Sequence, residues 1–281
     1  MKKILVTGAT GQLGTELSVL ASNYPQYEWI LADRKEVTLD NLELLQTQIE
    51  EINPDIVFNC GAYTAVDKAE SEKELAFAIN QDAVALIAKF TAENKARLIH
   101  ISTDYVFDGS SSIALNEEAK TNPINIYGES KLAGEIACLK ENPESIIIRT
   151  SWVYSKFGNN FVKTMQRLMQ EKDEIKVVND QIGSPTYAAD LAQSMIDIVK
   201  FSKWIPGIYN YSNEGEISWY EFALNIKELG NYKCKVIGIP SSSYPNPAKR
   251  PSFSLLDKTK IRSVYHLDIP SYKESLKKIF V

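Results

Sequence analysis

Cysteine and histidine are scarce in this chain. The three cysteines, Cys60, Cys138 and Cys234, are widely separated and have no CxxC spacing. This pattern excludes a disulfide framework and a cysteine-rich zinc site, and it favours a reducing compartment such as the cytoplasm. The only two histidines are His100, in an apolar segment, and His266, near the C-terminus, and we expect both to be structural.

Long apolar runs and an excess of positive charge are also absent. The run that begins at Ile4 ends at Thr7, too early for a signal peptide, and no stretch reaches the roughly 20 apolar residues of a membrane span. Lys and Arg total 31 against 36 for Asp and Glu, which gives a net charge of -5. We therefore expect a cytoplasmic protein that binds neither membranes nor nucleic acid.

Short apolar segments alternate with helix-length segments along the first half of the chain. The apolar segments cover residues 4–6, 29–32, 56–58, 98–101 and 146–148. One intervening stretch places apolar residues on a single helical face: Ile79, Ala83, Leu86, Ile87 and Phe90. Continuous apolar strands joined by helices indicate an α/β fold with a doubly wound parallel sheet of the Rossmann type.

The pattern becomes less regular after residue 150, which suggests a second, smaller domain. We expect residues 1–150 to form a dinucleotide-binding domain to which part of 175–203 returns. The substrate-binding domain would then comprise 151–174 and 204–281. Four prolines between residues 240 and 251 indicate a loop there.

A glycine-rich turn follows the first predicted strand. The segment GATGQLG places Gly8, Gly11 and Gly14 between that strand and a predicted helix from Gln12 to Ser22. Glycine lets the backbone approach a pyrophosphate, and the helix N-terminus favours negative charge. The position therefore predicts a dinucleotide site, although the spacing is GxxGxxG and not the more familiar GxGxxG.

Residues at the end of the second predicted strand bear on the choice of cofactor. Asp33 lies 19 residues after Gly14, where a carboxylate binds the adenosine ribose of NAD. Arg34 follows it and can pair with the extra phosphate of NADP, so the choice between NADH and NADPH stays open. Thr38 and Leu39 lie where the next short strand should approach the adenine.

A tyrosine and a lysine four residues apart indicate proton-transfer chemistry. On a helix, Tyr127 and Lys131 share one face, and an ammonium group beside a phenol lowers its pKa. A hydroxyl at the end of the preceding strand can then orient a substrate carbonyl. We assign that role to Thr103, with Ser102 as the alternative, and we interpret Cys60 as a buried filler.

Seven segments in this order resemble the extended short-chain dehydrogenase/reductases, over nearly the whole length of the chain. They are GATGQLG (8–14), AYTAVDKAE (62–70), STDYVFDG (102–109), YGESKLAGE (127–135), RTSWVY (149–154), GNNFVKTM (158–165) and NDQIGSPT (179–186). The GxxGxxG spacing is typical of that family. Within it, the chain is similar to the reductases of 4-keto nucleotide sugars.

The resemblance implies an activity and a set of site residues. Hydride would pass from NADH or NADPH to the C4 keto carbon of dTDP-4-dehydro-L-rhamnose, Tyr127 would protonate the oxygen, and dTDP-L-rhamnose would form. Lys131 would bond to the nicotinamide ribose and Thr103 would orient the carbonyl. The implied dinucleotide contacts are Gly11, Gln12, Leu13, Asp33, Ala62, Tyr63 and Thr64, and the implied sugar-nucleotide contacts are Val66, Asp104 and Trp152.

Arg250 is a further candidate contact, because its guanidinium suits the substrate pyrophosphate; the alternative is a loop arginine held by a carboxylate. Some members of the family hold magnesium at a dimer contact. Glu16 matches one of their ligands but Ala189 lies where another is expected, so we assign no metal. The sequence does not decide whether the protein forms a homodimer.

The rival interpretations are a nucleotide-sugar epimerase, a dehydratase or a non-catalytic binding subunit. Dehydratases place a second carboxyl group after the aspartate, where this chain has Tyr105.

Overall fold

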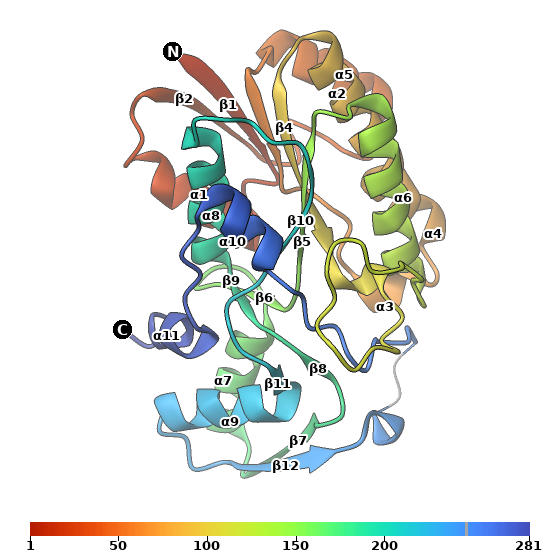
Figure 1. Ribbon diagram of the computed structural model, residues 1–281. Helices are drawn as coiled ribbons and strands as arrows, with labels where there is room; N and C mark the ends of the chain where they lie inside the picture. The colour runs from red at the N-terminus through yellow and green to blue at the C-terminus, as the bar shows by residue number, and fades with distance from the viewer. Residues whose placement is uncertain (245–246) are drawn as a thin grey trace.

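Six parallel strands form the central sheet of the computed structural model (Figure 1). The structure describes residues 1–244 and 247–281. The strand order is β10 (Gly207–Tyr211), β5 (Ile146–Thr150), β4 (Arg97–Thr103), β3 (Ile56–Asn59), β1 (Lys2–Thr7) and β2 (Tyr27–Ala32). The chain winds outward in both directions from β1 and β3, which confirms the predicted fold class. Ligands bind such sheets at the carboxyl ends of the strands beside this switch point.

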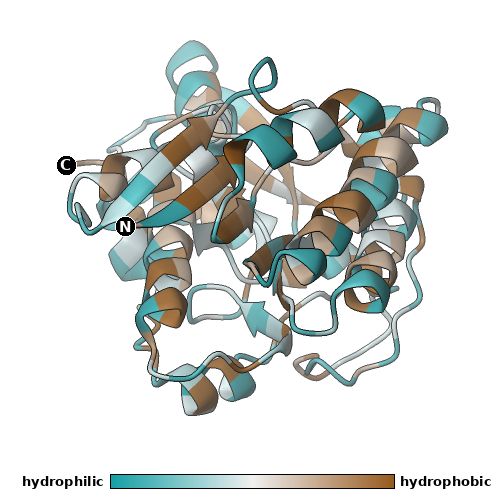
Figure 2. Ribbon diagram, turned by 90° about the horizontal axis from the view of Figure 1, so that it is seen from above, coloured by the Kyte–Doolittle hydropathy of each residue, from teal (hydrophilic) through white to brown (hydrophobic). Residues whose placement is uncertain are grey.

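Helices cover both faces of the sheet (Figure 1). One face carries α1 (Gln12–Ala21), α8 (Ala188–Lys200) and α10 (Thr259–Tyr265), and the other carries α2 (Leu42–Ile52), α5 (Ala83–Glu93) and α6 (Ile126–Glu141). Figure 2 shows hydrophilic and hydrophobic segments alternating along the helix ribbons, as expected where one side of each helix packs on the sheet. The central strands are buried between the two helical layers, as their continuous apolar sequences predicted.

The predicted helix over residues 79–90 is part of a longer one. It begins as α4 (Lys73–Phe77), passes through a π-helical turn at Ala78–Asp82 and continues as α5. By length and composition this 21-residue helix could span a membrane, but half of its apolar 18-residue stretch is buried inside the fold. In the π turn, the buried Asn80 bonds to both the N–H and the C=O of Tyr63.

A second core lies beyond the carboxyl ends of the strands. It is built from three two-stranded pairs: β6 (Val153–Tyr154) with β9 (Thr186–Tyr187), β7 (Glu174–Val178) with β12 (Lys235–Ile239), and β8 (Ile182–Gly183) with β11 (Ile217–Ser218). The helices α7 (Phe161–Glu171), α9 (Trp219–Leu229) and α11 (Tyr272–Lys277) pack around an aromatic cluster centred on Phe222. Short helical turns at Val66–Ala69 (α3), Asp104–Val106 (η2) and Ser241–Ser243 (η3) complete the described elements.

The path of the chain between the two cores differs in part from the sequence-based division. From the sequence we placed residues 204–281 in the smaller domain, yet β10 pairs with β5 in the large sheet and α10 packs on that sheet. We expected part of 175–203 to return to the first domain; within that range α8 packs on the large sheet, whereas β7 pairs with β12. We propose that the two cores mark two domains. Pro245, in the predicted proline-rich loop, lies outside the described residues.

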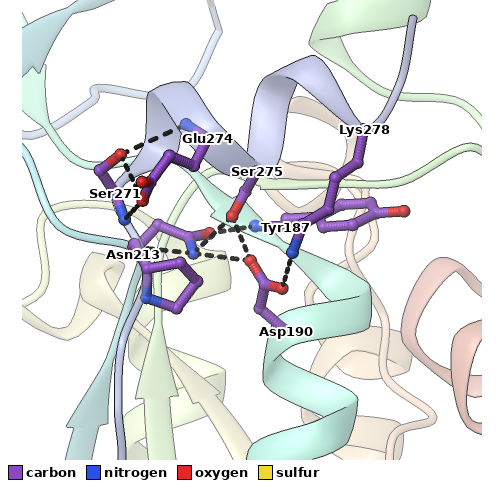
Figure 3. A network of polar contacts seen from close by, with 8 residues as sticks. Tyr187, Asp190, Asn213, Ser271, Glu274, Ser275 and Lys278 are labelled. Carbon is purple, nitrogen blue, oxygen red and sulfur yellow. Dashed lines mark hydrogen bonds and ion pairs between the residues drawn. The ribbon is translucent and has the colours of Figure 1, made fainter. Parts of the chain in front are cut away.

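A polar network joins the C-terminal helix to α8 (Figure 3). The Asp190 carboxylate accepts hydrogen bonds from Asn213 Nδ2 at 2.8 Å, from the Ser275 hydroxyl and from Lys278 Nζ at 2.9 Å. Asn213 also accepts a bond from the Tyr187 N–H at 2.7 Å. Because Asp190 belongs to a helix of the first core and Ser275 to one of the second, this network connects the two cores.

Candidate active site

The glycine turn between β1 and α1 is packed too tightly for side chains. Gly8 has a φ of +65°, and a Cβ there would lie 2.7 Å from the Cα of Gly61 in the loop after β3. A Cβ on Gly14 would lie 2.3 Å from the Gly8 carbonyl oxygen. Gly11 caps α1, and among the described residues no side chain caps this helix and no acidic residue occupies its first turn. The N-terminus of α1 is therefore open to an anion.

This turn forms one end of a cleft of about 570 Å³ at the carboxyl ends of the central strands. Many of the predicted site residues line it: Gly8, Gly11, Gln12, Leu13, Ala62, Thr64, Val66, Thr103, Asp104, Tyr127, Lys131 and Trp152. Seven predicted residues do not line it: Gly14, Asp33, Arg34, Thr38, Leu39, Tyr63 and Arg250. The structure thus gathers the proposed catalytic groups and the glycine turn around one space.

The end of β2 carries the residues predicted to select the cofactor. The Asp33 carboxylate accepts hydrogen bonds from the N–H groups of Lys35 and Glu36, at 2.7 and 3.1 Å. The exposed Arg34 pairs with Asp40, which also accepts a bond from the Thr38 hydroxyl. The short strand expected at Thr38 and Leu39 is absent from this described segment, which is a loop. A side chain holds the backbone of this loop in place: the Thr38 N–H donates a hydrogen bond to the Gln48 side chain.

Two predicted substrate contacts follow β4. Thr103 caps the turn η2, its hydroxyl accepting a bond from the Tyr105 N–H at 3.2 Å and donating to Asp104 at 3.1 Å. Asp104 is 2% exposed, and its Oδ2 has no partner among the described residues. Burial raises the pKa of this carboxyl to about 6. The alternative hydroxyl, Ser102, donates to Glu135 at 2.5 Å, which leaves Thr103 the better candidate.

Tyr127 lies in the first turn of α6. Asn125 caps this helix by accepting a bond from the Gly128 N–H at 2.8 Å. A Cβ on Gly128 would lie 2.2 Å from the Tyr105 carbonyl oxygen, so glycine here lets α6 approach η2. Burial raises the pKa of Tyr127 to about 12, against the opposing effect of a hydrogen bond with Thr103. At neutral pH the phenol therefore keeps the proton that a donor needs.

Lys131 lies one turn after Tyr127 and is 2% exposed. Its Nζ donates to the Ile101 carbonyl at 2.7 Å, and burial lowers its pKa to about 8. From the sequence we expected this ammonium to lower the pKa of Tyr127. In the structure the net pKa shift of Tyr127 is upward, because desolvation of the phenol outweighs the interactions that favour its ionised form.

Trp152 extends from the loop after β5 toward the second core. Its backbone has a φ of +49°, unusual for a non-glycine residue. Its ring stacks on Trp219 with centroids 3.6 Å apart and an interplanar angle of 10°. A Cβ on Gly183 would lie 2.9 Å from Cε2 and Cζ2 of the same ring. The ring therefore packs against a helix-borne indole and a bare backbone.

Arg250 is paired with a carboxylate at the edge of the cleft. Its guanidinium donates to Asp67 Oδ2 at 2.8 Å and to the Ala248 carbonyl at 3.3 Å, and it also bonds to the Tyr105 side chain. This is the carboxylate-held arginine that the sequence left open as an alternative. The ion pair is partly exposed, at 22% for Arg250 and 40% for Asp67.

Several residues that line the cleft were not predicted as site residues, although some of them lie in sequence segments that carry the family resemblance. Gly158 has a φ of +64°, and a Cβ there would lie 3.1 Å from Gln12 Cγ. Asn160 donates to Gln12 Oε1 at 3.0 Å, so the GNN segment quoted above positions the glycine turn. Tyr105 also lines the cleft and packs edge-on against Tyr127 with centroids 5.5 Å apart. It lies in the segment STDYVFDG, where the sequence singled it out only as the residue in place of a dehydratase carboxyl group.

Two further side chains considered from the sequence are Cys60, which has an unreactive thiol, and Glu16, which has a hydrogen-bond partner. Cys60 lines the cleft, and burial raises the pKa of its thiol, which disfavours the reactive thiolate. Glu16 accepts a bond from Ser155 at 2.6 Å. Within residues 1–244 and 247–281, no group of three or more His, Cys, Asp or Glu side chains is arranged to hold a metal ion.

Comparison with known proteins identifies the family. The family described as RmlD substrate binding domain matches residues 1–281. The chain belongs to this family. It is 39% identical to the dTDP-4-dehydrorhamnose reductase of Aggregatibacter actinomycetemcomitans, covering 99% of this chain and 98% of that protein. It is 40% identical to that of Sinorhizobium fredii, with coverage of 99% and 96%.

A solved structure agrees with this assignment. The crystal structure of dTDP-4-dehydrorhamnose reductase from Bacillus anthracis in complex with NADP superimposes with a TM-score of 0.95 at 40% identity. The match covers 100% of this chain and 99% of that one. The family and the whole fold of this chain are therefore shown, and the roles of its individual residues are argued below.

Proposed function

We propose that this protein reduces the 4-keto group of dTDP-4-dehydro-L-rhamnose to give dTDP-L-rhamnose, with NADH or NADPH as the hydride source. One observation carries the proposal: Thr103, Tyr127 and Lys131 line the same cleft as the glycine turn. The relatives of about 40% identity named above are reductases of this substrate. We place the reaction in the cytoplasm. We also propose that the protein forms a homodimer, and light scattering, which gives the molar mass in solution, tests this.

The residues present fit a dinucleotide. Gly8, Gly11 and Gly14 leave the backbone of the turn bare, and the N-terminus of α1 favours a pyrophosphate. Asp33 and Arg34 lie at the end of the neighbouring strand, where an adenosine ribose would be held. The bound nicotinamide supplies the hydride. The Ala62–Thr64 segment and Lys131 would bind the remainder of the cofactor.

The chain's own side chains account for the proton. Thr103 and Tyr127 would both bond to the keto oxygen, and Tyr127 would deliver its proton there as negative charge develops. Lys131, in its ammonium form, would stabilise the phenolate left behind. The unpaired Oδ2 of Asp104 is an acceptor suited to a sugar hydroxyl. Val66 and Trp152 would contact the sugar, and Arg250 the diphosphate.

Dehydration is disfavoured by the side chain that follows Asp104. Tyr105 packs against Tyr127, and burial raises the pKa of its phenol further above the usual value. A neutral phenol is a poor base for removing a carbon-bound proton, which is the step that a dehydratase adds. Reduction without prior dehydration is therefore the better match.

The decisive experiment is a coupled oxidation assay. Purified protein is given NADH or NADPH with a panel of 4-keto nucleotide sugars, and the loss of absorbance of the reduced cofactor is followed. We expect turnover with dTDP-4-dehydro-L-rhamnose. Cofactor binding by calorimetry without turnover on any member of the panel would instead indicate a non-catalytic binding subunit.

A further inference from the structure

A buried histidine lies directly behind Lys131. His100, on β4, is 0% exposed, and its Nε2 is 3.4 Å from Lys131 Nζ. From the sequence we expected this residue to be structural, and the mechanism above does not use it. Burial, with the nearby Lys131 charge, lowers the pKa of His100 well below its usual value. The ring is therefore neutral, with one N–H donor and one nitrogen acceptor.

A hydrogen-bonded array determines which nitrogen carries the proton. The Gly61 N–H donates to the Thr7 hydroxyl at 3.1 Å, and that hydroxyl donates to Asn59 Oδ1 at 2.7 Å. Asn59 Nδ2 then faces His100 Nδ1 at 3.0 Å. Because an amide NH₂ only donates, Nδ1 must be the acceptor. The proton of the ring is thus on Nε2, directed at Lys131.

The direction of the Nε2–H bond determines which charge form of Lys131 the ring favours. An uncharged amine has a lone pair that can accept the bond, whereas an ammonium group has donors only. The array therefore favours the amine form of Lys131 and directs the ammonium form away from the ring, toward the Ile101 carbonyl 2.7 Å away. Because the pKa of Lys131 is about 8, the array affects the pH at which the ammonium form needed beside the phenolate is lost.

We propose that His100 is a positioning residue for Lys131, and that Thr7 and Asn59 fix its ring so that Nε2–H faces the lysine nitrogen. The proposal rests on the function proposed above for its kinetic consequence, but not for its structural part. Thr7, Asn59 and His100 are each at most 1% exposed, so solvent does not compete for these bonds.

Other groups around Lys131 act on its charge as well. Glu135 and Cys138 lie on the same helix and Cys60 follows β3, and all three favour the ammonium form. Glu135 is itself held by Arg149 at 2.7 Å and by Ser102. Desolvation is the largest effect and brings the pKa of Lys131 to about 8. His100 acts in the same direction as desolvation.

Nuclear magnetic resonance tests the structural part without substrate. The chain has only two histidines, so ¹⁵N-histidine labelling gives two ring systems, and His266→Asn assigns them while leaving the site intact. We expect His100 to stay neutral with its proton on Nε2 from pH 5 to 9. We also expect its Nε2 shift to titrate with a midpoint near 8 that is absent in Lys131→Met. A proton on Nδ1, or a shift indifferent to Lys131, overturns the proposal.

Reversing the array tests the kinetic part. In Asn59→Asp the carboxylate accepts from Nδ1–H, so Nε2 becomes an acceptor that stabilises the ammonium form of Lys131. We expect the alkaline midpoint of the kcat profile to move upward by about one pH unit. His100→Leu removes the N–H that opposes the ammonium form, so the alkaline midpoint should move upward in this variant too, with little change in cofactor KM, and His266→Asn should change neither quantity. An unmoved midpoint together with an unchanged tautomer in Asn59→Asp contradicts the proposal.

Discussion

The two sides of the cleft are held in place by different means. The catalytic wall (Thr103, Tyr127 and Lys131, with His100 behind them) consists of side chains on β4 and α6. The ligand wall is lined by Trp152. It is supported by an aromatic stack with Trp219 and, beside the cleft, by the partly exposed ion pair of Arg250 and Asp67. Trp152 and Arg250 lie on loops, and groups on loops adjust more readily to a ligand than groups on packed regular elements.

Each wall has an ion pair, and the two pairs differ in their exposed fractions and in the number of hydrogen bonds that join them. Arg149 and Glu135, behind the catalytic wall, are 3% and 2% exposed and are joined by two bonds of 2.7 and 2.9 Å. Arg250 and Asp67, in the ligand wall, are 22% and 40% exposed and share one bond of 2.8 Å. Buried bidentate pairs resist disruption, while partly exposed pairs exchange partners at little cost.

The largest effect should come from Tyr127, the proposed proton donor of the catalytic wall. Tyr127→Phe removes only the hydroxyl, so we expect kcat to fall by about 10²- to 10⁴-fold while dinucleotide affinity is kept. The matched control is Tyr105→Phe, which alters the neighbouring phenol and should change kcat far less. A Tyr127→Phe enzyme with near wild-type kcat would remove this residue from the mechanism.

The buried pair behind the same wall should dominate stability. Glu135→Gln leaves the Arg149 charge without its counterion, and we expect the free energy of unfolding to fall by about 3–5 kcal/mol. Glu171→Gln breaks the exposed pair with Arg167 and should cost at most about 1 kcal/mol. Denaturant unfolding measures both, and equal losses would show that burial does not distinguish them.

Acidic pH should weaken the contact that we propose between the sugar and Asp104, the residue after Thr103. Burial raises its pKa to about 6, so the carboxylate form is present above that pH and is lost as the pH falls through it. We expect the KM of the nucleotide sugar to rise about tenfold for each unit below pH 6. Asp104→Asn should raise KM and abolish this dependence. A wild-type KM that is flat between pH 5 and 7 would argue against the contact.

The aromatic stack of the ligand wall should contribute less. Trp219→Ala leaves Trp152 in place without its partner, so we expect KM for the nucleotide sugar to rise by about two- to tenfold with kcat nearly unchanged. The matched control is Trp204→Ala, an indole at the far side of the molecule that packs against Arg97. If kcat fell as far as KM rose, the stack would support the chemistry and not only binding.

The fold and the glycine turn were predictable because each is encoded locally. The apolar runs at 4–6 and 56–58 are continuous, and the structure places them as β1 and β3 beside the switch point of the sheet. Tyr127 and Lys131 share a helix, so their spacing alone places them on one face. Local pattern also predicted the hydroxyl of Thr103 at the end of β4.

Contacts between distant segments were not predictable in the same way. In the sequence, His100 is a single polar residue within an apolar strand. Only the register of β3 against β4 brings Asn59 beside it. The pairing of Arg250 with Asp67 joins residues 183 positions apart. The strand β10 joins the large sheet through a crossover connection, and no short sequence motif predicts that connection.

The smallest effects should come from the ion pair of the ligand wall, and they should have opposite signs. If Arg250 leaves Asp67 to bind the substrate diphosphate, Asp67→Asn frees it in advance and should lower the KM of the nucleotide sugar by about threefold. Arg250→Met should raise that KM by at least as much. Each change should alter the free energy of unfolding by less than about 1 kcal/mol, because the pair is partly exposed.

A competition experiment separates this exchange from a purely structural pair. The inhibition constant of dTDP against the nucleotide sugar should shift with KM in both variants, since dTDP carries the diphosphate but lacks the 4-keto hexose. A parallel rise of both constants in Asp67→Asn would mean that the carboxylate holds Arg250 in its binding position. The ion pair would then belong with the prearranged groups of the catalytic wall, and the contrast between the two walls would be limited to the aromatic stack.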